Sequence, residues 1–270
     1  MRVGIGLPNT TPGADGPLLL EWARRADAGP FSTLAVLDRL AYESIEPFTA
    51  LAAAAAVTSR IRLATMIVIG PLRTTALLAK QASSVQAIAG GRLTLGLSVG
   101  ARLDDYEVAG VDHRRRGARL SEQLAYLRSA DGIDDGLQLL AGGASGAAFA
   151  RMARYTDGYA HGGGPPRAFA AAAVSARAAW SDLGRSGQPQ LWGQGYFALG
   201  DAERGAAYLR DYYAFTGGFA ETIAAGNLTS ARAVKDFIRG YEAAGCEELI
   251  LLPTVADIDE VDRLARVIAG

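Results

Sequence analysis

The chain of 270 residues has a net charge of −1, and half of its residues are hydrophobic. This composition is typical of a globular protein and provides neither the basic face of a nucleic-acid binder nor the polybasic arm of a membrane-surface protein. Its single cysteine, Cys246, excludes a disulfide within the chain and indicates a reducing, cytoplasmic compartment. The length is close to the roughly 250 residues of one (β/α)8 barrel, so we expect a single domain over residues 1–270.

Short apolar runs alternate with helical patterns along the chain. The first residues, MRVGIGLP, run directly into a strand pattern, so neither an export signal nor a membrane span is expected. The predicted strands are residues 2–7, 33–37, 61–69, 93–99, 137–141, 158–161, 190–199 and 248–252. The predicted helices are 17–28, 47–59, 74–88, 113–128, 146–155, 167–183, a region capped by Asp201, 230–244 and 258–268. This alternation predicts a (β/α)8 TIM barrel, with an open doubly wound sheet as the alternative.

The stretch from residue 60 to residue 100 contains two apolar runs separated by the length of one helix. Strand, helix and strand in this order form a parallel unit, because parallel partners require a crossover of this length. The ends of both strands, TMIVIGP and LSVGAR, would open onto the carboxyl edge of the sheet. Since α/β proteins place their chemistry at that edge, the functional site is expected there.

The same stretch carries a specific resemblance. TSRIRLATMIVIGPLRTTALLAKQASSVQAIAGGRLTLGLSVG is similar throughout to a stretch of the bacterial luciferase-like family of flavin and deazaflavin oxidoreductases, and LLAGGAS, ARYTDGY and GYEAAGCEELILLP resemble its second half. The resemblance implies an enzyme that acts on a small organic molecule, usually as a homodimer. The cofactor would be reduced FMN for monooxygenation or the deazaflavin F420 for hydride transfer.

The chain departs from the family at several positions. The link SADGIDDG replaces several tens of residues between the helix ending near Leu127 and the strand starting near Leu137, so we expect a site that is more open or covered by a partner chain. Asp38 and Arg39 stand where many deazaflavin-dependent members have Asp-His, and Ser98 stands where luciferase has its reactive cysteine. Light emission by the luciferase route is therefore not implied.

The end of the third predicted strand is the candidate support for the cofactor ring. The resemblance implies a non-prolyl cis peptide bond between Met66 and Ile67 that supports the ring of FMN or F420. It also implies that Thr65, Ser98 and Gly100 belong to the cofactor-binding residues around this bulge. The alternative is an ordinary buried barrel strand.

The turn AGGAS is the candidate phosphate site. Gly142, Gly143, Ala144 and Ser145 directly precede a predicted helix, so backbone N–H groups and the positive end of the helix dipole could meet a phosphate without obstruction by side chains. The family binds its cofactor phosphate at the corresponding position. Alternatively, the turn is a common strand ending, and Ser145 only caps the helix.

Two titratable residues are candidate catalytic groups. His161 ends a strand before flexible glycines, of which Gly162 is a further cofactor-binding candidate, and its imidazole could contact the phosphate or act as an acid or base. Asp38 ends the second strand and could orient a catalytic group or bond to the edge of the ring. The alternatives are a surface histidine and a salt bridge between barrel elements.

Residues 114–116 are three arginines near the start of a predicted helix, where cations oppose the helix dipole. An anionic partner, such as the polyglutamate tail of a deazaflavin, a nicotinamide phosphate or an acidic substrate, would explain them. A solvated face, or pairing with Asp104, Asp105 and Glu107, is the alternative. No metal site is expected, because two isolated histidines and one cysteine do not form a ligand set.

Two other functions are compatible with the sequence. A non-catalytic flavin-binding or partner subunit would keep the barrel and lack the chemistry, and the missing Asp-His pair and the missing segment favour it. A barrel lyase or aldolase is disfavoured, because Lys80 and Lys235 both lie inside predicted helices and neither ends a strand.

Overall fold

The fold is a closed parallel barrel. A computed structural model describes residues 1–129 and 136–270, and its strands pair in chain order, with β8 returning to β1. The strands are β1 (Arg2–Gly6), β2 (Thr33–Val36), β3 (Arg62–Ile69), β4 (Leu93–Ser98), β5 (Gln138–Gly142), β6 (Gly158–Ala160), β7 (Gln190–Phe197) and β8 (Glu248–Pro253). The predicted (β/α)8 TIM barrel is confirmed, and the open doubly wound sheet is wrong.

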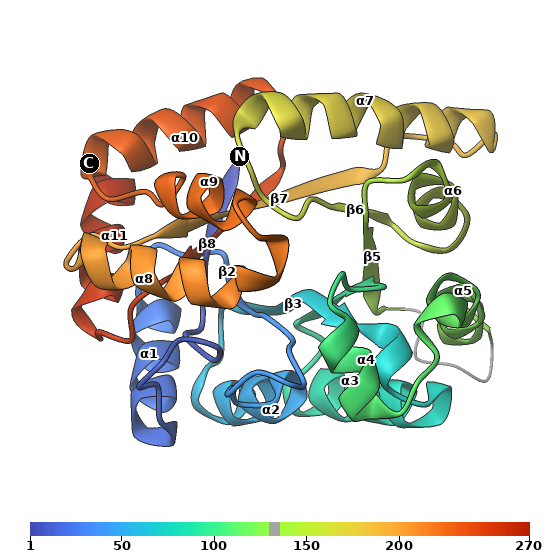
Figure 1. The fold of residues 1–270 in the computed structure, drawn as a ribbon, viewed down its shortest axis with the longest axis horizontal. Coiled ribbons are helices and arrows are strands. Elements are labelled where there is room, and N and C mark those ends of the chain that lie inside the picture. The colour runs from blue at the N-terminus through green and yellow to red at the C-terminus, as the bar shows by residue number, and fades with distance from the viewer. Residues whose placement is uncertain (130–135) are drawn as a thin grey trace.

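Helices connect the strands around the outside of the barrel (Figure 1). They are α1 (Gly16–Ala28), α2 (Pro47–Val57), α3 (Thr75–Ile88), α4 (Leu103–Ala109), α5 (Arg116–Leu127), α6 (Gly146–Tyr155), α7 (Pro166–Asp182), α8 (Ala202–Tyr212), α9 (Phe219–Ala225), α10 (Ala231–Ala243) and α11 (Asp259–Ala269). Single 3-10 turns occur at η1 (Gly70–Leu72), η2 (His113–Arg115) and η3 (Ala214–Thr216). No helix within the described ranges is long and apolar enough to cross a membrane.

Short polar side chains fix where several helices begin. In each case the residue before the helix accepts a hydrogen bond from a backbone N–H of the first turn, which satisfies a donor that the helix itself leaves free. These caps are Asp15, Thr74, Ser145, Asp201 and Ser230. The predicted cap at Asp201 is thereby confirmed, and Ser145 does cap its helix.

Alternate residues along the strands contribute to two separate cores. Leu34 and Leu63 pack between the strands and the outer helices, whereas the adjacent Ala35 and Ala64 face the interior of the barrel. The interior cluster continues upward through larger side chains, namely Met66, Leu140, Trp192, Tyr196, Ile250 and Leu252. The barrel is therefore filled, and any ligand must bind at its end.

The segment after β7 contributes the residues that cover the carboxyl end of the barrel. Helices α8 and α9 pack against one another (Figure 1), and Tyr208, Leu209 and Tyr212 of α8 belong to the same buried cluster as the barrel interior. Tyrosines of α8 thus pack over this end of the barrel, and a site that is more open or covered by a partner chain stays a prediction. The shortened link SADGIDDG spans residues 129–136, of which 130–135 lie outside the described residues.

Candidate functional site

The bulge on β3 lies where the sequence resemblance implied it. The pairing of β3 with β4 shifts register between Thr65 and Val68, and the Met66–Ile67 peptide bond is cis, as predicted. Ile67 packs closely over two glycines: a Cβ built on Gly96 would lie 2.8 Å from its Cγ2 atom, and one on Gly142 would lie 2.8 Å from its Cδ1 atom. The bulge therefore meets the end of β5, where the candidate phosphate turn begins.

The polar residues beside the bulge are already hydrogen-bonded within the sheet. The buried Thr65 hydroxyl donates to the Gly96 carbonyl at 2.7 Å and accepts from the Gly96 N–H at 2.8 Å. The Ser98 hydroxyl accepts from the N–H of Gly100 at 3.1 Å, and Gly100 has a φ of 66°, a conformation that favours glycine. Thr65 therefore joins β3 to β4. Direct contact of these residues with a cofactor stays a prediction.

The turn after β5 is exposed at its tip and built around one obligatory glycine. Gly143 has a φ of 128°, and a Cβ atom added there would lie 2.6 Å from the Cβ of Ala148. Ala144 and Ser145 are exposed, and the Ser145 hydroxyl accepts from the Ala148 N–H at 3.2 Å. The turn thus presents its backbone at the positive end of a ten-residue helix, which is a favourable place for an anion.

A tyrosine that the sequence did not single out connects this turn to His161. The Tyr159 hydroxyl donates to the Gly143 carbonyl at 3.0 Å and lies 3.3 Å from His161 Nδ1, while the imidazole packs edge-on against Phe169 at 5.6 Å. Burial raises the pKa of Tyr159 to about 12, so its proton is retained at neutral pH. The position of His161 beside the phosphate turn is therefore fixed from one side by a hydrogen bond and from another by an aromatic ring.

His161 has a buried nitrogen that lacks a partner among the described residues. Its Nε2 atom is inaccessible to solvent and makes no hydrogen bond, and burial lowers the pKa of the imidazole. An isolated buried polar atom is unfavourable, and a phosphate oxygen next to it would accept from Nε2 of the protonated imidazole. The residues at the ends of β5 and β6 therefore fit the phosphate of FMN or F420.

Gly162 directly follows His161. Its backbone is exposed, and its carbonyl accepts a hydrogen bond from Gln194 at 3.1 Å.

Asp38 makes the ion pair that the sequence left open as an alternative. Its carboxylate accepts from Arg73 Nη1 at 2.7 Å, from Arg73 Nη2 at 3.1 Å and from the N–H of Ile69 at 2.9 Å. Burial raises the pKa of Asp38, and the Arg73 guanidinium opposes this shift. Arg73 also binds Glu46 at 3.0 Å. Asp38 thus connects the end of β2 to the end of β3, and a catalytic role for it stays a prediction.

Arg39 lies among tyrosines at the same end of the barrel. Its Nε donates to Asp105 at 2.8 Å, and its guanidinium lies 5.2 Å and 5.1 Å from the ring centroids of Tyr42 and Tyr212. Next to it, the hydroxyls of Tyr196 and Tyr213 are 2.6 Å apart. Sequence reasoning named Arg39 beside the candidate Asp38 and as a departure from the family, without giving it a role of its own. Its environment comes from α4 and α8, which the local pattern does not predict.

The arginines at 114–116 do not pair with the acidic residues considered for them. Asp104 binds Arg102 and lies 3.7 Å from Arg39, and Asp105 is bound by Arg39, so the expected pairing with the run is wrong for these two residues.

In the described ranges, no group of three His, Cys, Asp or Glu side chains is arranged to hold a metal ion.

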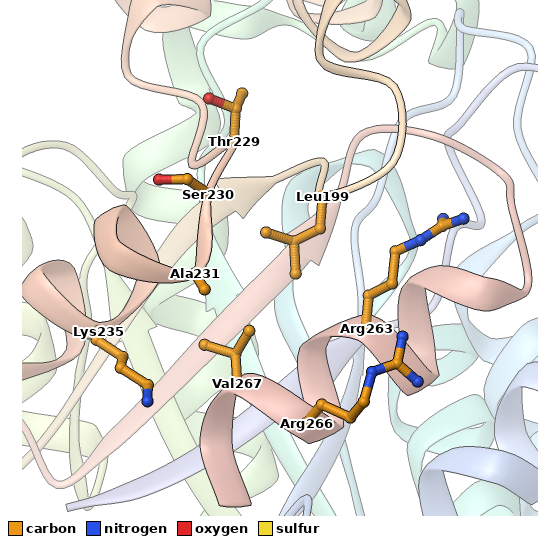
Figure 2. A pocket seen from close by; sticks show the side chains of 8 residues that line it. All are labelled: Leu199, Thr229, Ser230, Ala231, Lys235, Arg263, Arg266 and Val267. Carbon is orange, nitrogen blue, oxygen red and sulfur yellow. The ribbon is translucent and has the colours of Figure 1, made fainter. Parts of the chain in front are cut away.

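Hollows occur at the rim of the barrel end and on its outer wall. One of about 380 Å³ is bordered by the loops after β1 and β2 and includes Tyr42 and Asp211, and one of about 260 Å³ beside it includes Tyr208 and Asp211. A third, of about 400 Å³, lies between α10 and α11 (Figure 2) and is lined by Leu199, Thr229, Ser230, Ala231, Lys235, Arg263, Arg266 and Val267. None of the residues predicted for the cofactor site lines this third hollow.

Comparisons with known proteins agree with the sequence motifs. Residues 1–132 match the family model described as luciferase-like monooxygenase. The uncharacterized protein Rv0940c of Mycobacterium tuberculosis is 32% identical over a region that covers 53% of this chain and 65% of the relative. The chain thus spans just under two thirds of the length of that relative. The resemblance to the luciferase-like family is thereby confirmed.

Solved structures share the fold over nearly their whole length. An F420-dependent secondary alcohol dehydrogenase in complex with an F420-acetone adduct matches with a TM-score of 0.81 at 15% identity, covering 100% of this chain and 99% of that one. The oxygenating constituent of 3,6-diketocamphane monooxygenase from Pseudomonas putida, in complex with FMN, matches with a TM-score of 0.71 at 15% identity, covering 98% and 95%. At these identities the likeness shows the fold alone.

Proposed function

We propose that this luciferase-like chain is an oxidoreductase that binds reduced FMN or F420 at the carboxyl end of its barrel and acts on a small organic molecule. The observation that carries the proposal is the meeting of the Gly143 turn, the start of α6 and the unpartnered Nε2 atom of His161. Both cofactors contain a phosphate, which is the group that such donors bind. The structural neighbours that bind F420 and FMN further support the proposal.

The chain's own residues would bind and orient the cofactor and exclude water. The β3 bulge at Met66 and Ile67 would lie behind the ring, and Tyr159 would hold His161 and Gly143 in place around the phosphate. Bound FMN would supply oxygen activation for monooxygenation, and bound F420 would supply hydride transfer. The tyrosines of α8 would shield the reacting groups from solvent, which strengthens electrostatic interactions inside the site.

A non-catalytic cofactor-binding or partner subunit is the second candidate. It is favoured by the ion pair of Asp38 with Arg73, which engages both oxygens of that carboxylate, and by Arg39 in place of a histidine. Both candidates predict cofactor binding. Only the first predicts turnover.

Cofactor titration tests the proposal. Purified chain is titrated anaerobically with FMN, reduced FMN and F420, and binding is followed by fluorescence quenching. We expect one of the three to bind tightly and His161→Ala to weaken it, whereas His113→Ala, which alters the other histidine outside the site, should leave binding unchanged. Absence of binding by all three would refute the proposal. Tight binding without turnover of any organic substrate would support the non-catalytic candidate.

The proposal extends to organisation and compartment. Residues 1–270 would act as one domain and assemble as a homodimer, for which the exposed side chains of Leu103 and Val108 on α4 offer apolar surface. A cytoplasmic location is supported by Cys246, which is unpaired and buried. Sedimentation equilibrium checks the assembly, and a monomer at micromolar concentration would contradict it.

A further inference from the structure

A cation at the barrel end has donors that nothing in the described chain accepts. The side chain of Arg39 is only 4% exposed, and its Nη1 and Nη2 atoms are buried without a hydrogen-bond partner. The nearest further carboxylate oxygen, on Asp104, lies 3.7 Å from Nη2, beyond hydrogen-bonding distance. A buried guanidinium normally has its donors satisfied, so the unfilled pair points to an acceptor that the described residues do not supply.

The guanidinium is held in one orientation. Asp105, itself fully buried, accepts from Arg39 Nε at 2.8 Å and from the N–H groups of Leu40 and Ala41 at 2.9 Å and 2.7 Å. The aromatic ring of Tyr212 lies close to the cation. The rings of Tyr42 and Tyr212 are inclined at 76° to one another, so the guanidinium cannot lie flat on both, and an N–H bond directed at a ring face is much weaker than one to a carboxylate oxygen. The free edge is therefore both rigid and unsatisfied.

We infer that Arg39 anchors a carboxylate of the substrate, so that the substrate class is small organic acids. This inference rests on the proposed function, because it takes the barrel end as the active site. The fork of two parallel N–H donors matches the two oxygens of a carboxylate, and this bidentate pair is stronger than a bond to a neutral carbonyl. A neutral amide of the same shape offers only one acceptor and no charge.

The rim provides a route to Arg39. Tyr42 lines the hollow of about 380 Å³, and the centroid of its ring lies 5.2 Å from the Arg39 guanidinium, which places the ring between the hollow and the cation. Its hydroxyl donates to Asp211 at 2.6 Å, which joins the loop after β2 to α8. A carboxylate entering from the hollow reaches Arg39 when this hydrogen bond opens and the ring turns aside. On this route Tyr42 would control access to Arg39.

Another arginine provides the competing explanation. Arg204 lines the adjoining hollow of about 260 Å³, and its side chain donates a 3.4 Å hydrogen bond to the carbonyl of Pro12. An acid held at the open rim would use Arg204, whereas an acid that passes Tyr42 would use Arg39. The two arginines thus form a matched pair for mutation.

The test compares benzoate with benzamide, which have nearly the same shape and differ in charge. Binding to the full chain is measured by isothermal titration calorimetry, without cofactor and with saturating FMN. We expect wild type to prefer benzoate by about tenfold or more, as charge-assisted hydrogen bonds do. Arg39→Lys should reduce the preference, and Arg39→Met with Asp105→Asn, which leaves no unpaired buried carboxylate, should abolish it. Arg204→Met should retain it.

Further measurements distinguish the outcomes. Tyr42→Phe, which removes the bond to Asp211, should speed benzoate association in stopped-flow experiments and keep the preference. Circular dichroism verifies that each variant is folded. Equal binding of the two probes by wild type under both conditions, or loss of the preference in Arg204→Met alone, would overturn the inference. So would an Arg39→Lys variant that loses FMN affinity but keeps the preference. Failure of wild type to bind any cofactor would overturn the proposed function and leave the probe comparison readable.

Discussion

The ion pair between Asp38 and Arg73 yields the most direct test of a catalytic against a structural role. The change is Asp38→Asn, which keeps the shape of the side chain and removes its charge. In wild type the carboxylate is 2% exposed and the guanidinium 10% exposed, so the variant leaves a buried cation with one partner fewer. Removing one member of a buried pair typically costs about 3 to 5 kcal/mol.

Two features of the structure place the cost at the lower end of this range. Arg73 keeps its 3.0 Å contact with Glu46, and burial raises the pKa of Asp38, so the charged carboxylate was itself costly to bury. We therefore expect a loss of about 3 kcal/mol in the free energy of unfolding. With a slope of about 3 kcal/mol per molar, this lowers the urea midpoint by about 1 M.

Urea denaturation followed by tryptophan fluorescence measures this loss, and the double variant with Arg73→Met completes a cycle. The double variant should recover part of the stability, because no unpaired charge remains. Cofactor affinity of the folded Asp38→Asn protein should stay close to wild type. An unchanged urea midpoint together with loss of turnover would refute the structural reading and assign Asp38 to the chemistry.

The phosphate turn and its histidine provide three more tests. Burial lowers the pKa of His161, so inorganic phosphate bound beside it should raise that pKa, observed on its C2 proton by NMR with His113 as the internal reference. Because the pKa of His161 in the folded protein lies below the ordinary 6.5, the unfolded chain binds more protons, and the free energy of unfolding should fall as the pH falls below 6.5. His161→Gln should reduce this pH dependence, which urea denaturation from pH 5 to 7 measures. Gly143→Ala, at a φ of 128° and 2.6 Å from the Ala148 Cβ, should weaken FMN or F420 binding at least about tenfold, whereas Gly218→Ala, with open space around it and before a different helix, should not.

The sequence predicted the fold well because barrel strands are short apolar runs with turn residues on either side. The apolar runs of β4 and β5 are followed by Gly100 and Gly143, both of which adopt positive φ. These glycines in the sequence therefore indicated where the turns begin. The helices α4 and α9 were missed because each has only seven residues, too few for a helical repeat to stand out.

The site was predictable only where it is local in the chain. The Gly142–Ser145 turn and the bulge at Met66 and Ile67 are contiguous segments with a recognisable pattern. The partner that completes the first, Tyr159, lies 16 residues from Gly143 and is placed by strand pairing. Such contacts form because the barrel closes, so the spacing of residues along the sequence does not predict them.

The order of strands around the barrel relates the two side chains of the site that have unpartnered buried nitrogens. His161 follows β6 and Arg39 follows β2, and β3, β4 and β5 lie between these strands in the closed barrel. The bulge that would support a ring is on β3, next to β2. A cofactor with its phosphate at His161 would therefore place its ring toward Arg39. An organic acid bound to Arg39 would contact that ring and would not occupy the phosphate site. Phosphate recognition and substrate recognition thus depend on different strands, and variants at one should leave binding at the other intact.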